Sequence, residues 1–203
     1  MKLYDGGRAP NPRRVRVFLA EKGISLPIEP VDLGALQQKS PAYAAVNPLQ
    51  RVPALVLDDG TVLTESIAIC RYFEEVQPDP PLFGRGALEK ARIEMWNRRV
   101  ELHFLFPVSH VFRNTHPAMK EMEVPQVPEW AEANKPRIAD FIAFLDNELN
   151  DRPFVAGDSY TVADITGLVA VDFMKPAKLP VPDELTNLRR WHAAVSARPS
   201  ARA

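Results

Sequence analysis

The alternation of apolar and polar residues predicts seven short elements in the first 76 residues. Segments with an extended, β-rich pattern alternate there with segments whose apolar residues recur at helical spacing. The expected elements are, in chain order, strand 2–4, a helix that Asn11-Pro12 opens with Asn11 as N-cap and that Gly23 ends, strand 27–31, a short helix from Ser40-Pro41, strands 52–57 and 61–63 around Asp58-Asp59-Gly60, and helix 66–75. This β-α-β-α-β-β-α order is typical of a compact α/β domain with a parallel βαβ unit, a hairpin and a helix.

The rest of the chain shows helical periodicity only. A segment rich in proline and glycine, residues 78–86, has the composition of a linker. The helices expected after it are 87–114 with a kink at Pro107, 129–150, one that starts at Thr161 with Asp164 reaching back to cap it, and about 183–197. We therefore predict two domains, an α/β domain over residues 1–77 and an all-α helical bundle over residues 87–203.

Composition and charge narrow the class of protein. Lys+Arg number 25 and Asp+Glu 26, a balance that gives no electrostatic attraction to nucleic acid or to an anionic membrane. No apolar run reaches the ~18 residues that span a bilayer, and Met1 to Gly6 does not have the pattern of a signal peptide. The single cysteine, Cys70, lies on an apolar stripe and excludes an internal disulfide and a structural zinc site, which indicates a cytoplasmic location. His103 and His110 lack carboxylate or cysteine neighbours at ligand spacing, so no metal site is expected.

Three local segments carry a resemblance to a known family. Asn-Pro-Leu-Gln-Arg-Val-Pro-Ala-Leu at 47–55 precedes a predicted strand, Leu-Thr-Glu-Ser-Ile-Ala-Ile at 63–69 begins a helix, and Thr-Val-Ala-Asp-Ile at 161–165 caps a distant one. Together they resemble the cytosolic glutathione S-transferase family, in its bacterial type, over essentially the whole chain. The resemblance implies a thioredoxin-like first domain and a helical second domain.

The resemblance also implies how glutathione, an acidic tripeptide with a thiol, would be bound. Pro53 would be cis and would leave the Val52 backbone free to pair with the peptide, in the manner of strand-like recognition. Glu65 would meet the γ-glutamyl amine and Ser66 its carboxylate, at a helix N-terminus that favours anions. From the residues alone, a trans turn proline at Pro53 and a plain N-cap at Ser66 are the favoured interpretations. The side chains expected near the glycine carboxylate are Gln38, Gln50 and Arg51.

The position that activates the thiol departs from the family pattern. A free thiol with a pKa near 8.5 is only a few per cent ionised at pH 7, so the enzyme must stabilise the thiolate. Ala9 stands where many members carry serine or cysteine, and it offers no donor. Asn11 is the first alternative, because Ala9-Pro10-Asn11 is similar to the Thr-Pro-Asn segment of nu-class members; a helix-capping role would compete for its side chain. Tyr4, on the first strand, is the second candidate.

A second substrate would meet the long helix of the second domain. The residues at helical spacing along one face are Trp96, Arg99, His103, Phe106, His110 and Arg113. The mixture of aromatic and cationic groups suits an apolar electrophile with an anionic part, and we single out the first four of them as its site. The aromatic residues could instead belong to the core, and the arginines to a dimer interface.

The predicted function is transfer of glutathione to a hydrophobic electrophile, or glutathione-dependent reduction of a peroxide or a disulfide. The alternative is a non-catalytic glutathione-binding carrier or assembly module, because a fold alone does not set function. The family resemblance further implies a homodimer, formed through the first domain of one subunit and the long helix of the other.

Overall fold

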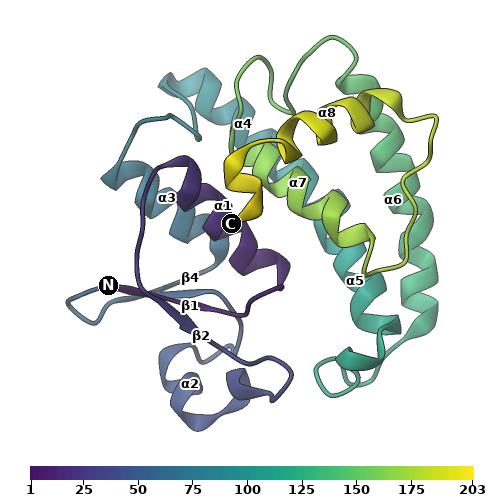
Figure 1. Cartoon of the computed structure of the whole chain (residues 1–203). Coiled ribbons are helices and arrows are strands. Elements are labelled where there is room, and N and C mark those ends of the chain that lie inside the picture. The colour runs from purple at the N-terminus through teal and green to yellow at the C-terminus, as the bar shows by residue number, and fades with distance from the viewer. The chain divides into compact units, whose positions relative to one another are not determined.

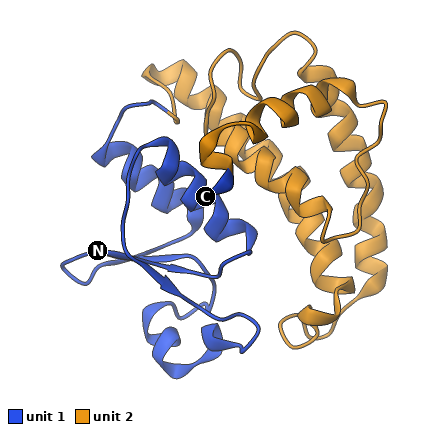
Figure 2. Cartoon of the chain, viewed as in Figure 1, with its two compact units in different colours: residues 1–81, 202–203 blue, residues 82–201 orange.

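The computed structural model describes all residues from 1 to 203. The chain divides into two compact units, residues 1–81 with the last two residues, and residues 82–201 (Figure 2). The boundary between the two units lies after Pro81, within the proline- and glycine-rich segment 78–86.

Unit 1 contains a four-stranded mixed sheet with the order β2-β1-β3-β4. Its strands are β1 (Lys2–Asp5), β2 (Ile28–Pro30), β3 (Ala54–Val56) and β4 (Val62–Thr64). Its helices are α1 (Pro10–Glu21), the 3₁₀ turn η1 (Gln37–Lys39), α2 (Pro41–Val46) and α3 (Ser66–Val76). The β1–β2 pair is parallel and the β1–β3 and β3–β4 pairs are antiparallel, which confirms the predicted thioredoxin-like βαβαββα order. Helices α1 and α3 lie on one face of the sheet and α2 on the other (Figure 1).

The start of α1 differs from the prediction. The helix begins at Pro10, with Ala9 in extended conformation as its N-cap and no side-chain cap hydrogen bond. Proline is favoured at the first helical position because its fixed φ suits the helix. Its lack of an N–H costs nothing there, since an N–H at this position would have no intrahelical acceptor. Asn11 is therefore the second residue of the helix, and the predicted N-cap role for it is wrong.

Unit 2 is all-helical. Its elements are α4 (Gly86–Val100), the π-helical turn η2 (Glu101–Leu105), α5 (Phe106–Thr115), the 3₁₀ turn η3 (Pro117–Met119), α6 (Pro128–Glu148), α7 (Val162–Met174), α8 (Thr186–Ser196) and the 3₁₀ turn η4 (Pro199–Arg202). The long helix expected over 87–114 is thus interrupted by a π turn that ends at Leu105, two residues before Pro107. A π turn inserts an extra residue and rotates the side chains that follow it.

Helix α7 forms the centre of unit 2, since nearly all of its residues are buried. The predicted cap is present: the Thr161 N–H donates to Asp164 Oδ2 at 2.9 Å. The other oxygen of the Asp164 carboxylate, Oδ1, accepts from Trp191 Nε1 at 2.9 Å and from the Val155 N–H at 2.8 Å. The carboxylate of one buried residue therefore joins α7 to α8 and to the loop before α7.

Candidate functional site

A buried arginine joins the first turns of α1 and α3 in unit 1. Arg14, only 2% exposed, donates to Ser66 Oγ from Nε at 3.1 Å and from Nη2 at 2.7 Å. Its Nη2 also donates to Asn11 Oδ1 at 3.1 Å. Two residues that the sequence places 55 positions apart, Asn11 and Ser66, are therefore held by one guanidinium.

The start of α3 has the features of an anion-binding turn. Glu65, which precedes the helix, is exposed and has a left-handed φ of 61°, and the helix begins at Ser66 itself. Ser66 is therefore not the N-cap, so the plain-cap interpretation of this residue is wrong. Because Ser66 Oγ accepts from Arg14, its own hydroxyl proton remains as a donor, beside the N–H groups of the first helical turn that have no intrahelical acceptor.

A second backbone turn is held rigidly in the same unit. The Val52–Pro53 peptide bond is cis, which confirms that prediction. The carbonyl of Arg51 accepts from Tyr43 Oη and from Asn47 Nδ2, both at 2.7 Å, so the segment before the cis bond is tied to α2. A Cβ on Gly6 would lie 2.7 Å from Val52 Cγ2, so only glycine at that position lets Val52 approach the end of β1.

The predicted partners of a glycine carboxylate lie on either side of α2. Gln38 is buried in η1, before that helix. Gln50 has a left-handed φ of 54° and is half-buried, and Arg51 is exposed, both in the loop after α2.

The loop between β1 and α1 is held in place by a carboxylate that no motif in the sequence singles out. Asp5, buried at the end of β1, accepts from the Gly7 N–H at 2.5 Å and forms an ion pair with Arg16. Arg16 Nη2 also donates to the Gly7 carbonyl at 3.0 Å. The backbone that leads through Ala9 to Asn11 is thereby anchored from both sides.

The two candidates for thiol activation lie in different places. Tyr4 is half-buried and meets Tyr43 of α2 edge-on, with ring centroids 5.7 Å apart, and the Lys2 ammonium is 4.8 Å from its ring. The alternation along β1 sends Tyr4 to the face opposite Leu3 and Asp5. Asn11 belongs instead to α1 and contacts Arg14, so the structure groups Asn11, and not Tyr4, with Ser66.

The residues predicted for the electrophile do not share one environment in unit 2. Trp96 is 2% exposed and stacks on Phe144 at 5.9 Å, with the guanidiniums of Arg99 and Arg152 at 4.8 and 4.4 Å from its ring. His103 stacks on Phe141 at 6.0 Å. Phe106 is 40% exposed. The π turn between Val100 and Phe106 alters the simple helical spacing within this set, and the electrophile site stays a prediction.

Cys70 is a packing residue. It is fully buried, and burial raises the pKa of its thiol to about 12, so it is not a nucleophile near neutral pH.

None of the helices is both long enough and apolar enough to cross a membrane.

Comparison with known proteins identifies the family. Residues 9–76 match the glutathione S-transferase N-terminal domain, and residues 103–199 match the C-terminal domain of the same family. The chain is 38% identical to glutathione S-transferase 2 of Saccharomyces cerevisiae, over 98% of this chain and 87% of the relative. This chain belongs to the cytosolic glutathione S-transferase family.

Solved structures of this glutathione S-transferase family agree with that identification. The crystal structure of Gtt2 from Saccharomyces cerevisiae has a TM-score of 0.95 at 38% identity and covers 100% of this chain and 99% of its own. A class Gtt2 glutathione S-transferase of Vibrio parahaemolyticus has a TM-score of 0.87 at 35% identity, over 98% and 95% of the two chains. The predicted fold, the enzyme class and glutathione as co-substrate are thus confirmed. The nu-class features and the cytoplasmic location stay predictions.

Proposed function

We propose that this glutathione S-transferase binds glutathione in unit 1 and activates its thiol with the side-chain amide of Asn11. The observation that carries the proposal is the buried Arg14, which holds both Asn11 and Ser66. One residue thereby sets the position of the group that would receive the γ-glutamyl carboxylate and of the group that would receive the thiolate.

Binding of the peptide would use backbone and side chains from four turns. The Ser66 hydroxyl and the free N–H groups of α3 would hold the γ-glutamyl carboxylate, helped by the helix dipole and by the positive charge of Arg14. Exposed Glu65 would meet the amine, and the Val52 backbone would pair with the cysteinyl residue next to Pro53. The glycine carboxylate would be received by Gln38, Gln50 and Arg51.

Activation of the thiol needs a donor to the thiolate. Lowering the pKa of the thiol by about 2 units corresponds to about 2.7 kcal/mol of preferential thiolate stabilisation. A hydrogen bond to a charged group contributes about 1.5 to 3 kcal/mol, which is the required size. Because Asn11 Oδ1 accepts from Arg14, the Nδ2 amide is left as the donor. Ala9 has no donor and Tyr4 lies on the α2 face of the sheet, so Asn11 is the residue we select.

The second substrate would be an electrophile that meets the accessible residues of the predicted set, Arg99, His103 and Phe106. Their combination of cationic and aromatic groups suits an apolar electrophile with an anionic part. Reduction of an organic hydroperoxide by the same thiolate is the second reaction class to assay.

The predicted homodimer has support in the exposed side of α4. Leu88 is 74% exposed, and Ala91 and Met95 of the same apolar face are exposed too. An apolar helix face of this kind is typical of a protein interface. A Leu88→Glu variant should shift the protein from dimer to monomer in sedimentation analysis; a wild-type protein that sediments as a monomer would contradict the proposal.

The first experiment is a calorimetric titration with reduced glutathione, accompanied by an ultraviolet difference spectrum for the thiolate band. We expect saturable binding with a thiolate band near neutral pH, and turnover with a panel of electrophiles. Binding without the band and without turnover would favour the carrier function and overturn the activation mechanism. Absence of binding would overturn the glutathione site.

A further inference from the structure

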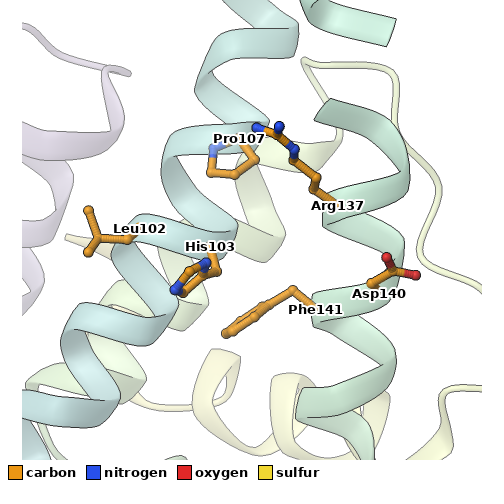
Figure 3. Close-up of a pocket in the computed structure, with 6 residues that line it drawn as sticks. All are labelled: Leu102, His103, Pro107, Arg137, Asp140 and Phe141. Carbon is orange, nitrogen blue, oxygen red and sulfur yellow. The ribbon is translucent and has the colours of Figure 1, made fainter. Parts of the chain in front are cut away.

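Unit 2 contains a groove that shares no residue with the sites proposed for glutathione and for the electrophile. The groove has a volume of about 600 Å³ and is lined by three consecutive segments, the second half of α7, the loop after it, and α8 (Figure 1). This α7–α8 groove shares no residue either with the pocket of Figure 3, which contains His103 of the predicted electrophile set.

The α7–α8 groove has an apolar floor and a cationic rim. Met174 of α7 and Leu188 of α8 line it and are buried, at 2% and 0% exposure. Lys175 and Lys178, in the turn that follows α7, line it too and are exposed. An apolar surface bordered by charges of one sign is typical of an interface with an oppositely charged partner.

Hydrogen bonds within the protein hold both sides of the groove. Arg189 of α8 donates to the carbonyls of Val181 at 2.7 Å and Pro182 at 3.0 Å, so the loop is tied to the helix. His192 Nε2 lies 2.8 Å from Asp172 Oδ1, which joins α8 to α7. The groove is therefore formed before a partner arrives, and a partner that docks there does not have to order its walls.

The positive charge of the rim is not neutralised by the protein. The carboxylates of the two aspartates next to the groove already pair with His192 and Arg189 of α8. The ammonium groups of Lys175 and Lys178 form no ion pair and no hydrogen bond with the protein. These two lysines therefore present two cations to a partner.

The backbone of Lys178 indicates that its side chain has a use beyond the fold. Its φ is 57°, in the left-handed region. The Lys178 N–H donates to the Lys175 carbonyl at 3.0 Å and the Leu179 N–H to the Met174 carbonyl at 2.9 Å, which is the helix-ending motif whose left-handed position is usually glycine. Lysine is strained there, whereas the preference of a helix end for a nearby cation is already met by Lys175. Strain of this kind is common at binding sites.

The chemistry of the groove selects an acidic peptide. A small molecule with a single carboxylate would engage one ammonium, whereas two ammonium groups above an apolar floor match a chain that alternates carboxylate and aliphatic side chains. We propose that the α7–α8 groove docks a short acidic segment of a partner protein. Lys175 and Lys178 pair with its carboxylates, and Met174 and Leu188 receive its aliphatic side chains. Docking needs neither glutathione nor turnover.

The test is a titration of the full-length protein, without glutathione, followed by NMR of labelled methionine methyl groups. The probe is the acetylated and amidated peptide Gly-Glu-Leu-Glu-Leu-Glu-Gly, and the control peptide carries glutamine in place of each glutamate. We expect the Met174 methyl signal, assigned with Met174→Leu, to shift and saturate, and the acidic peptide to bind about fivefold more tightly or better. The Met95 signal of α4 should stay unchanged. Equal affinity of the two peptides, or a shift at Met95 instead of Met174, would overturn the proposal.

Variants of the two lysines test the rim. Lys178→Gly removes an ammonium and relieves the left-handed strain, so the affinity for the acidic peptide should fall while the midpoint of urea unfolding stays the same or rises. Lys175→Gln should lower the affinity in the same way, and Lys90→Gln, at an exposed position of α4, should not. Wild-type affinity in both rim variants would overturn the proposal.

Octanoate distinguishes a peptide from a small anion. It offers one carboxylate on an aliphatic chain, so it should displace the acidic peptide only at concentrations well above that of the peptide. Displacement at equal concentration would assign the groove to a small aliphatic anion and overturn the assignment to a peptide.

Discussion

The Arg14 guanidinium donates to Ser66 Oγ from two nitrogens, Nε at 3.1 Å and Nη2 at 2.7 Å. A hydroxyl oxygen that accepts two hydrogen bonds from a buried cation has its lone pairs occupied and its proton directed elsewhere. The same guanidinium reaches Asn11, so a change at Arg14 affects both residues that we place against glutathione.

Replacing Arg14 by lysine should weaken glutathione binding. An ammonium keeps the charge but cannot reproduce the fork that reaches Ser66 and Asn11 together. We expect the dissociation constant for glutathione to rise about tenfold or more, since hydrogen bonds to charged groups are worth about 1.5 to 3 kcal/mol. Calorimetric titration measures this. Arg92→Lys, at an exposed position of α4, is the control and should bind as the wild type. Unchanged affinity in Arg14→Lys would remove this residue from the site.

Two variants of Asn11 distinguish stabilisation of the thiolate from positioning of Arg14. Asn11→Ala removes both the donor and the acceptor for Arg14, whereas Asn11→Asp keeps an acceptor for Arg14 and removes only the donor. If the amide stabilises the thiolate, both should lose the thiolate band, and kcat/KM should fall about 100-fold, as when an oxyanion donor is removed. Tyr4→Phe should retain the band. Retention of activity in Asn11→Asp would instead assign Asn11 the role of positioning Arg14.

Much of this fold could be predicted from local pattern, because the responsible interactions are short in sequence. Ser40 caps α2 by accepting from the Tyr43 N–H, and Thr161 and Asp164 form a cap within four residues. The order of strands and helices followed from the same kind of local information. The start of α1 was misplaced by two residues because two prolines, Pro10 and Pro12, both suit a first helical turn.

The residues of the candidate site could be predicted only where they belong to a recognisable sequence motif. Arg14 was missed because it stands in the sequence Arg-Arg-Val-Arg, which has the composition of a solvated surface, while its partner Ser66 is 52 residues away. The different burial of Trp96 and Phe106 could not be predicted, because a π turn cannot be recognised from the spacing of apolar residues.

Removal of Lys22 should strongly destabilise unit 1. This lysine is fully buried, forms an ion pair with Glu74 at 2.6 Å, and donates to the carbonyls of Gln77 at 2.8 Å and Pro80 at 2.5 Å. Losing one partner of a buried ion pair costs about 3 to 5 kcal/mol. Urea unfolding of Lys22→Met should show a loss of this order, and the added change Glu74→Leu should recover part of it. The exposed Lys135→Met should cost less than about 1 kcal/mol. A similar small loss in Lys22→Met would contradict the prediction.

The free energy of unfolding should fall as the pH rises from about 4 to about 6, because of Asp164. Burial raises the pKa of this carboxyl from 3.8 to about 6, against the hydrogen bonds that favour its ionised form. Within this window the folded chain keeps the proton and the unfolded chain has lost it, so raising the pH favours unfolding by a term on the order of 3 kcal/mol. Urea unfolding across this range measures the slope. Asp164→Asn has no carboxyl to titrate at this position, so its free energy of unfolding should not show this fall with pH. The variant Asp158→Asn, changed at an exposed position, should show the same pH dependence as the wild type. If the free energy of unfolding of Asp164→Asn changed with pH as that of the wild type does, the assignment to Asp164 would be refuted.

Gly167→Ala should destabilise the protein, although alanine is the better helix former by about 1 kcal/mol. A Cβ at this position of α7 would lie 2.8 Å from Trp191 Cη2 and 3.1 Å from Cζ2. The indole cannot move away freely, because it is completely buried and its Nε1 donates to Asp164 at 2.9 Å. Overpacking of this kind costs about 1 to 3 kcal/mol, which exceeds the gain in helix propensity. Thermal and urea unfolding should therefore show a net loss in Gly167→Ala, and the loss should shrink when the same change is made in a Trp191→Phe background, where the ring is smaller. A stabilised Gly167→Ala variant would show that the indole yields and that helix propensity decides the outcome.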